Sequence, residues 1–137
     1  MNIFKGEKLQ RPETVALTTG NSFRENLADV MKLVPLDRKG YFGETSKRKG
    51  TRGVQIVKCS NPAQLAFDFQ RIAGKNFVSY RSIPGKGHIL TMKDGTIIKY
   101  RMYSSSKDGS PVVELEISGL KRVKSQKIHF VQGGSND

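Results

Sequence analysis

Residues 88–103 read HILTMKDGTIIKYRMY, and this stretch decides the fold class. Apolar and polar side chains alternate on both sides of Lys93-Asp94-Gly95, and an Asp-Gly pair supplies the positive φ angles of a tight hairpin turn. The alternation predicts one strand over residues 88–92 and its partner over residues 96–103. The centre of the chain therefore predicts an antiparallel sheet.

Two more strands follow along the chain. A polar loop at 104–111 leads to an alternating run at 112–117, and a basic connection at 121–125 leads to another at 126–131. Together these runs predict a four-stranded antiparallel meander. The segment 77–82 either extends the first strand or adds a fifth.

Two amphipathic helices precede the sheet. Between 21 and 34 the apolar residues recur at helical spacing until Pro35, which cannot continue a helix. Ser60-Asn61-Pro62 supplies an N-cap and a proline at the first position of a second helix, over 62–73. We expect an α+β fold in which the N-terminal helices pack on one face of the sheet.

The 137 residues are enough for one ordinary domain. Within it, 1–58 form a helical and basic-loop part with a loose lead-in over 1–20, 59–131 form the core of helix plus sheet, and 132–137 form a flexible tail. The formal net charge is +12, and the parts before and after residue 60 each carry 12 basic and 6 acidic side chains. Such a field attracts polyanions, foremost nucleic acid, with an anionic membrane surface or an acidic protein as alternatives.

Composition excludes several chemistries. One cysteine, Cys59, cannot form an internal disulfide, and with two histidines it cannot complete a Cys/His zinc site. No aspartate pair is spaced to hold magnesium, so we expect neither a metal nor a cofactor. No apolar stretch approaches the length of a membrane span, and the first ten residues lack the apolar core of a secretion signal.

Alternation also predicts which side chains share the polar face of the sheet. These are Lys99, Arg101 and Tyr103 on the second strand, Glu114 and Glu116 on the third, and Lys127 and His129 on the last. Outward lysine and glutamate commonly form solubilising ion pairs. A histidine beside arginine and glutamate is less ordinary, because metal-free RNA cleavage needs a base, an acid and a cation that stabilises the phosphorane.

We therefore take His129, Glu114 and Arg101 as catalytic candidates. His88, which follows the flexible Pro84-Gly85-Lys86-Gly87, is a second acid or base candidate. Ser104 to Ser106, including Ser105, offer hydroxyl donors. The candidate phosphate-binding residues are Lys99, Tyr103, Ser104, Lys86, Lys121, Arg122, Lys124, Lys47 and Arg48. For the basic arm at Lys47 and Arg48 and the basic cluster at 121–124, the alternative is merely solvated charge.

Residues 84–131, PGKGHILTMKDGTIIKYRMYSSSKDGSPVVELEI…QKIHFV, resemble the C-terminal nuclease domains of bacterial polymorphic and contact-dependent inhibition toxins of the barnase, EndoU, colicin and RelE-like class. The matching elements are the lysine-glycine approach, the DGT hairpin, the YR strand ending in serines, the DGSP turn and the closing KIHF strand. The glutamates of VVELEI depart from the aspartate that many such domains carry.

The resemblance implies a metal-independent endoribonuclease, often specific for tRNA, that leaves a 2′,3′-cyclic phosphate and a 5′-hydroxyl. By motif position it implies roles for Arg101, the serines after it, Lys127 and His129. It also implies an acidic cognate immunity protein, and secretion or delivery within a larger bacterial effector that acts in the target-cell cytoplasm. The alternative is a non-catalytic RNA- or DNA-binding module in which Tyr103, Tyr80 or Phe42 stacks on bases.

Overall fold

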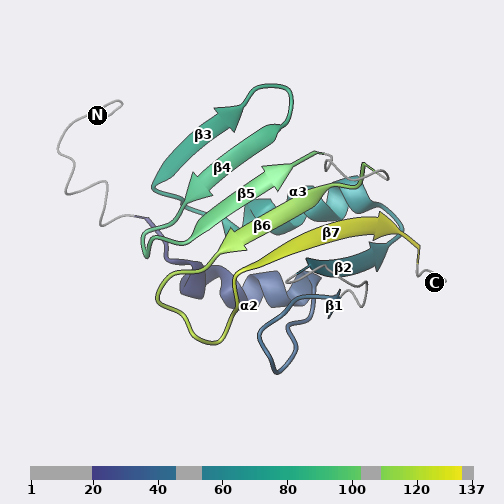
Figure 1. The fold of residues 1–137 in the computed structure, drawn as a ribbon. Helices are drawn as coiled ribbons and strands as arrows, with labels where there is room; N and C mark the ends of the chain where they lie inside the picture. Colours follow the sequence, from purple (N-terminus) through teal and green to yellow (C-terminus); the bar gives the residue numbers. More distant parts are fainter. Residues whose placement is uncertain (1–19, 46–53, 103–108, 134–137) are drawn as a thin grey trace.

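The computed structural model describes residues 20–45, 54–102 and 109–133, and Figure 1 shows a twisted sheet with helices behind it. Seven strands lie in the order β1-β2-β7-β6-β5-β4-β3. The strands are β1 (Glu44–Thr45), β2 (Val54–Cys59), β3 (Ser79–Ile83), β4 (Gly87–Thr91), β5 (Ile97–Arg101), β6 (Val112–Glu116) and β7 (Gln126–Gln132). The helices are α2 (Phe23–Leu33) and α3 (Pro62–Ala73).

The predicted four- or five-stranded antiparallel meander is wrong, because the sheet has seven strands and is mixed. β2 pairs in parallel with β7, and β1 pairs with β2 in antiparallel fashion. The run at 54–57 is short, and its partner strand lies about 70 positions along the chain, so no local turn signal marks the pairing. β2 also runs across residue 58, where we had divided the chain.

Two helices lie where the sequence predicts them, α2 within 21–34 and α3 at 62–73. Ser22 and Glu25 form a reciprocal capping box at the start of α2, and the helix ends before Val34 and Pro35. Asn61 caps α3, Pro62 opens it, and Gly74 ends it. Capping residues therefore located α3, whereas helical spacing and Pro35 located α2, and the capping box of α2 was not predicted.

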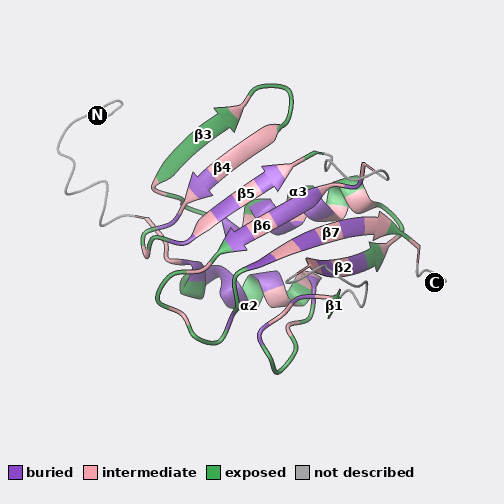
Figure 2. Ribbon diagram, viewed as in Figure 1, coloured by how far each residue is buried: buried purple, intermediate pink, exposed green. Residues whose placement is uncertain are grey.

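Both helices cover one face of the sheet (Figure 1). α3 packs across β2, β5, β6 and β7, and α2 packs against α3. The rings of Phe42 and Phe69 meet edge to face at 5.2 Å, and those of Phe69 and Phe130 lie 5.7 Å apart. Figure 2 shows the buried positions gathered on the central strands and α3, while β3 is exposed along most of its length. The core therefore lies between α3 and the middle of the sheet.

Two buried glutamines hold the segment before β1 against this core. The Gln126 side chain accepts a hydrogen bond from the Phe42 amide at 2.8 Å and donates to the Gly40 carbonyl at 3.0 Å. Gln55 donates to the Phe42 carbonyl at 3.1 Å. Phe42 is fully buried as a result, so it cannot serve as the base-stacking surface suggested for it.

No helix of the described residues is long and apolar enough to span a bilayer. Residues 1–19 of the lead-in predicted over 1–20, and residues 134–137 of the tail predicted over 132–137, lie outside the residues that the structure describes. Residue 132 belongs to β7 rather than to a tail.

Candidate active site on the open face of the sheet

The face of the sheet turned away from α2 and α3, called here the open face, carries the predicted polar set. Successive side chains of a strand alternate between the two faces, and directly paired residues share a face. Ile98, Val113 and Ile128 are fully buried on the helix side. Their sequence neighbours on the other side include Lys99, Glu114 and Lys127, whose outward orientation is thereby confirmed.

Six of these positions form a compact grid over β7, β6 and β5. His129, Val112 and Arg101 are successive partners in one row, and Lys127, Glu114 and Lys99 are successive partners in the next. Strand spacing of about 4.8 Å places the outer members of each row about 10 Å apart, with the two rows about 7 Å apart. A histidine, a carboxylate and three cations therefore surround one patch of sheet.

The row formed by Lys127, Glu114 and Lys99 is held together by charge. Lys99 Nζ lies 3.5 Å from Glu114 Oε1, and the two side chains are only 25% and 27% exposed. Lys127 is the direct partner of Glu114 on the other side. Partial burial weakens solvent screening, so this carboxylate fixes the position of the cations beside it more firmly than a fully exposed pair would.

His129 is anchored by a residue that sequence reasoning missed. Its Nδ1 lies 3.0 Å from the Oγ atom of Ser110, which is 7% exposed. Ser110 belongs to the DGSP turn just before β6, and the turn itself was the available signal. A hydroxyl held at Nδ1 orients the imidazole ring, as a positioned acid or base requires.

Two further cations border the grid. Lys86 lies in the turn before β4, where its carbonyl accepts from the Met102 amide at 2.8 Å, so it stands beside the Arg101 end of β5. Arg81 is exposed on β3 and shares the open face, since it pairs with Ile89 and through it with Lys99. Sequence reasoning left Arg81 out because the strand at 77–82 had no settled register.

His88 lies on the opposite face. It pairs directly with Tyr100, which is buried under α3, and its Nε2 lies 2.6 Å from Gln70 Oε1 on that helix. Burial lowers the pKa of His88 below the ordinary value of 6.5. The sheet thus separates the two histidines, and His88 cannot act on a phosphate bound over His129.

The basic cluster at 121–124 is also separate from the grid. Lys121, Arg122 and Lys124 lie in the connection between β6 and β7 and line a groove of about 800 Å³ with Arg38 and Lys39. Lys121 and Arg122 border a second groove of about 740 Å³ against α2. Lys127, which follows this cluster in the chain, lies on the open face instead.

Several candidates cannot be placed. Tyr103, Ser104, Ser105, Lys47 and Arg48 lie outside the described residues. The alternation of Ile98, Tyr100 and Met102 predicts that Met102 faces the core, and this prediction is wrong, because Met102 is 45% exposed. Within the described part of the chain, no group of three His, Cys, Asp or Glu side chains could hold a metal ion.

Comparison with known proteins gives no relative. No protein-family model, no curated protein and no solved structure matches this chain.

Proposed function

We propose that this chain is a metal-independent endoribonuclease whose active site is the open-face grid. The observation that carries the proposal is the register of β5, β6 and β7, which gathers the partly buried side chains of His129, Arg101 and Lys127 on one face of the sheet, around the buried Val112. Cleavage of a phosphodiester by an adjacent hydroxyl needs cations that bind the phosphate and a group that transfers protons. An arginine, two lysines and a positioned histidine provide these.

The reaction is an internal transphosphorylation. The 2′-oxygen of a ribose loses its proton to a base and bonds to the adjacent phosphorus, and the bond from phosphorus to the 5′-oxygen breaks. The 5′-oxygen takes a proton from an acid. The products are a 2′,3′-cyclic phosphate and a 5′-hydroxyl, with no other reactant consumed.

The grid offers a group for each task. His129 and Glu114 are the two proton carriers, one accepting the 2′-hydroxyl proton and the other supplying the proton to the leaving oxygen. Arg101 donates two hydrogen bonds to the phosphorane, and Lys127 adds a point charge beside it. Lys99 holds the Glu114 carboxylate in place through their ion pair.

The substrate class and the setting are part of the proposal. We infer that the RNA is a tRNA and that the enzyme acts as a toxin domain, delivered within a larger effector to the target-cell cytoplasm. An acidic immunity protein would neutralise it. The supports are the toxin-like order of motifs in the C-terminal half and the net charge of +12, which favours fast association with an acidic inhibitor.

The test is incubation of the purified chain with total bacterial RNA in excess EDTA, followed by mapping of the new ends. We expect discrete fragments that end in 2′,3′-cyclic phosphate. Intact RNA, or fragments that appear only when divalent cations are restored, would refute metal-independent cleavage.

The variant that ties cleavage to the grid is His129→Ala. We expect at least a hundredfold loss of turnover, the order of magnitude for a general acid or base, in a variant that still folds cooperatively although it loses the hydrogen bond to Ser110. Free imidazole added to the variant should restore part of the rate, which loss of a merely structural side chain would not allow. Lys32→Ala, an exposed change on α2, serves as the control. Full activity in folded His129→Ala would remove His129 from the mechanism.

A further inference from the structure

A pocket of about 410 Å³ opens on the helix side of β3 and β4, where the sheet extends beyond α3. It is distinct from the open-face grid, because His88, Leu90 and Tyr80 of its lining belong to the opposite face. The end of α3 and the connection to β3 complete the wall. The volume falls in the range of small-ligand sites.

Aromatic rings form a continuous line through this pocket. Neighbouring centroids are 5.9 Å apart for Phe77 and Tyr80, 5.4 Å for Tyr80 and His88, and 5.3 Å for His88 and Tyr100. Phe67 continues the line, at 6.3 Å from Tyr100. The rings therefore act as one surface rather than as scattered apolar residues.

The line is open to solvent at both ends, at Phe77 and Tyr80 on one side and at Phe67 on the other. Tyr80 is 54% exposed, Phe77 44% and Phe67 42%, and they are three of the four large exposed hydrophobics among the described residues. Single exposed apolar residues are ordinary, but contiguous ones with a polar border mark binding surfaces.

The polar groups of the pocket are fixed in position. Gln70 donates from its Nε2 to the Phe67 carbonyl at 3.2 Å, which leaves Oε1 to accept from His88 Nε2. The acceptor nitrogen of the neutral ring is then Nδ1. Burial lowers the pKa of His88, which keeps the imidazole in this neutral form near pH 7.

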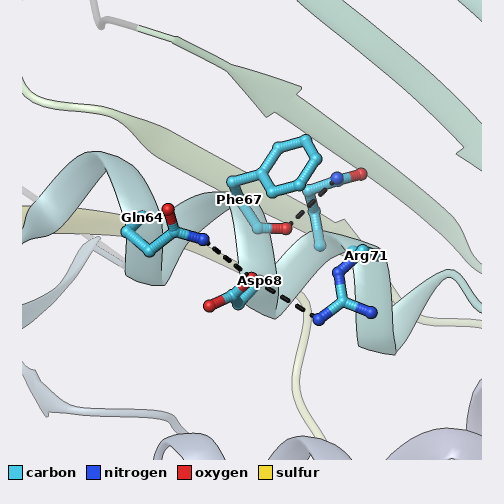
Figure 3. A network of polar contacts seen from close by, with 5 residues as sticks. Gln64, Phe67, Asp68 and Arg71 are labelled. Atoms are coloured by element: carbon cyan, nitrogen blue, oxygen red, sulfur yellow. Dashed lines mark hydrogen bonds and ion pairs between the residues drawn. The ribbon is translucent and has the colours of Figure 1, made fainter.

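Positive charge stands at the rim. Figure 3 shows Arg71 on α3 held toward Asp68, 3.5 Å away, and Asp68 in turn accepts from Gln64. Lys75, exposed beyond the end of α3, also borders the pocket. The pocket therefore combines flat aromatic rings and fixed polar groups in its interior with cations at its rim. This combination suits a ligand with an aromatic ring and an anionic group.

We propose that this pocket binds an unpaired nucleobase of single-stranded RNA, stacked on Tyr80 and Phe77 with its phosphate toward Lys75 and Arg71. The proposal rests on the RNA-binding part of the proposed function and not on cleavage. It gives the enzyme a second contact with its substrate, on the face opposite the grid, which selects RNA whose bases are splayed from a helix.

The test uses a short 2′-O-methyl oligouridylate with one central 2-aminopurine, whose fluorescence falls when the base stacks. The 2′-O-methyl groups prevent cleavage, and the chain contains no tryptophan to confuse the signal. We expect quenching on binding. An oligonucleotide abasic at the central position should bind about tenfold more weakly or worse, as for loss of one stacked base.

Substitutions locate the contact. Tyr80→Leu keeps an apolar side chain but removes the flat ring, so we expect loss of the quenching and about a tenfold loss of affinity, while Tyr80→Phe retains both. Tyr41→Leu makes the same change outside the pocket and should leave both unchanged. The Tyr80→Leu variant should no longer distinguish the abasic oligonucleotide from the intact one.

The outcomes separate the two proposals. Cleavage of RNA by a wild type that shows no quenching, or equal binding of the abasic oligonucleotide, would overturn the base pocket alone. The second result would point to an aromatic side chain of a protein partner as the occupant. Quenching that depends on Tyr80 without RNA cleavage would sustain the pocket and overturn the ribonuclease.

Discussion

Gln126 shows how much one buried side chain contributes to the order of this fold. Its amide bonds to the Phe42 N–H group, to the Gly40 carbonyl and to the Lys124 carbonyl, the last at 2.7 Å. It is 6% exposed, so water cannot replace these partners if they are lost.

Replacing this glutamine by leucine tests that role. Gln126→Leu has a similar volume but leaves the Phe42 N–H group without an acceptor, and we expect about 1–3 kcal/mol less stability in urea unfolding. Gln132→Leu, on the exposed end of β7, should stay within about 0.5 kcal/mol of wild type. Equal midpoints for the two variants would show that the bonds of Gln126 are replaced on mutation.

The sequence predicted the face on which a side chain lies where polar and apolar residues alternate along a strand. It did not predict contacts between residues that are distant in the chain. The outward orientation of Lys99, Glu114 and Lys127 followed from period-2 alternation. The face of His88 did not, because the glycine-bearing turn before it leaves the register open. The contact between Ser110 and His129 joins residues 19 positions apart, and the DGSP turn marks Ser110 without indicating its partner.

Among the strands of five or more residues, β3 is the least supported. It is an outermost strand with four exposed residues, and of the described elements only β4 packs against it. β7, in contrast, pairs with β2 and β6 and is covered by α3. Local opening free energies follow such differences in burial and pairing.

Native-state hydrogen exchange measures this order. We expect the bonded amides of β3 to exchange well before those of β7, which should approach the protection of global unfolding. The amides of β2 should be protected from exchange to about the same degree as those of β7, because the two strands are paired along six residues. Protection in β3 as strong as in β7 would contradict the view of β3 as a weakly held edge.

Elements specified by interactions between residues close in the sequence could be predicted, whereas those specified by distant partners could not. Both helices could be located because caps and prolines lie within a few residues of their ends. The hairpin of β4 and β5 follows from Asp94-Gly95, with Gly95 at a φ of 92°. β1 and β2 could not be assigned to the sheet, because their place depends on the distant β7.

For the whole molecule, charge is the dominant surface property. The net charge of +12 predicts strongly salt-dependent RNA binding, since each neutralised phosphate of a single strand releases counterions. The grid and the groove at Lys121 and Arg122 are separate basic surfaces, so the path of the RNA backbone can be mapped by removing one cation at a time.

Lys127→Ala provides that measurement. We expect the slope of log affinity against log salt concentration to fall in magnitude by about 0.7 to 1, the loss of one phosphate contact. Lys32→Ala on α2 should leave the slope unchanged. An unchanged slope for Lys127→Ala, with a reduced slope for Arg122→Ala, would move the backbone path from the open face to the groove.

The position of β7 has a consequence for how the molecule is made. This strand follows the other six in the chain but lies between β2 and β6 in the sheet. A nascent chain can form the local hairpins early. β2 cannot pair with β7 until a segment about 70 residues further along the chain is available, and so large a sequence separation slows folding. Lys127 and His129 arrive on that same strand. If the open face is the active site, a chain still being synthesised lacks a complete active site and does not cleave the RNA of its own ribosome. Activity begins only when β7 pairs with β2 and β6.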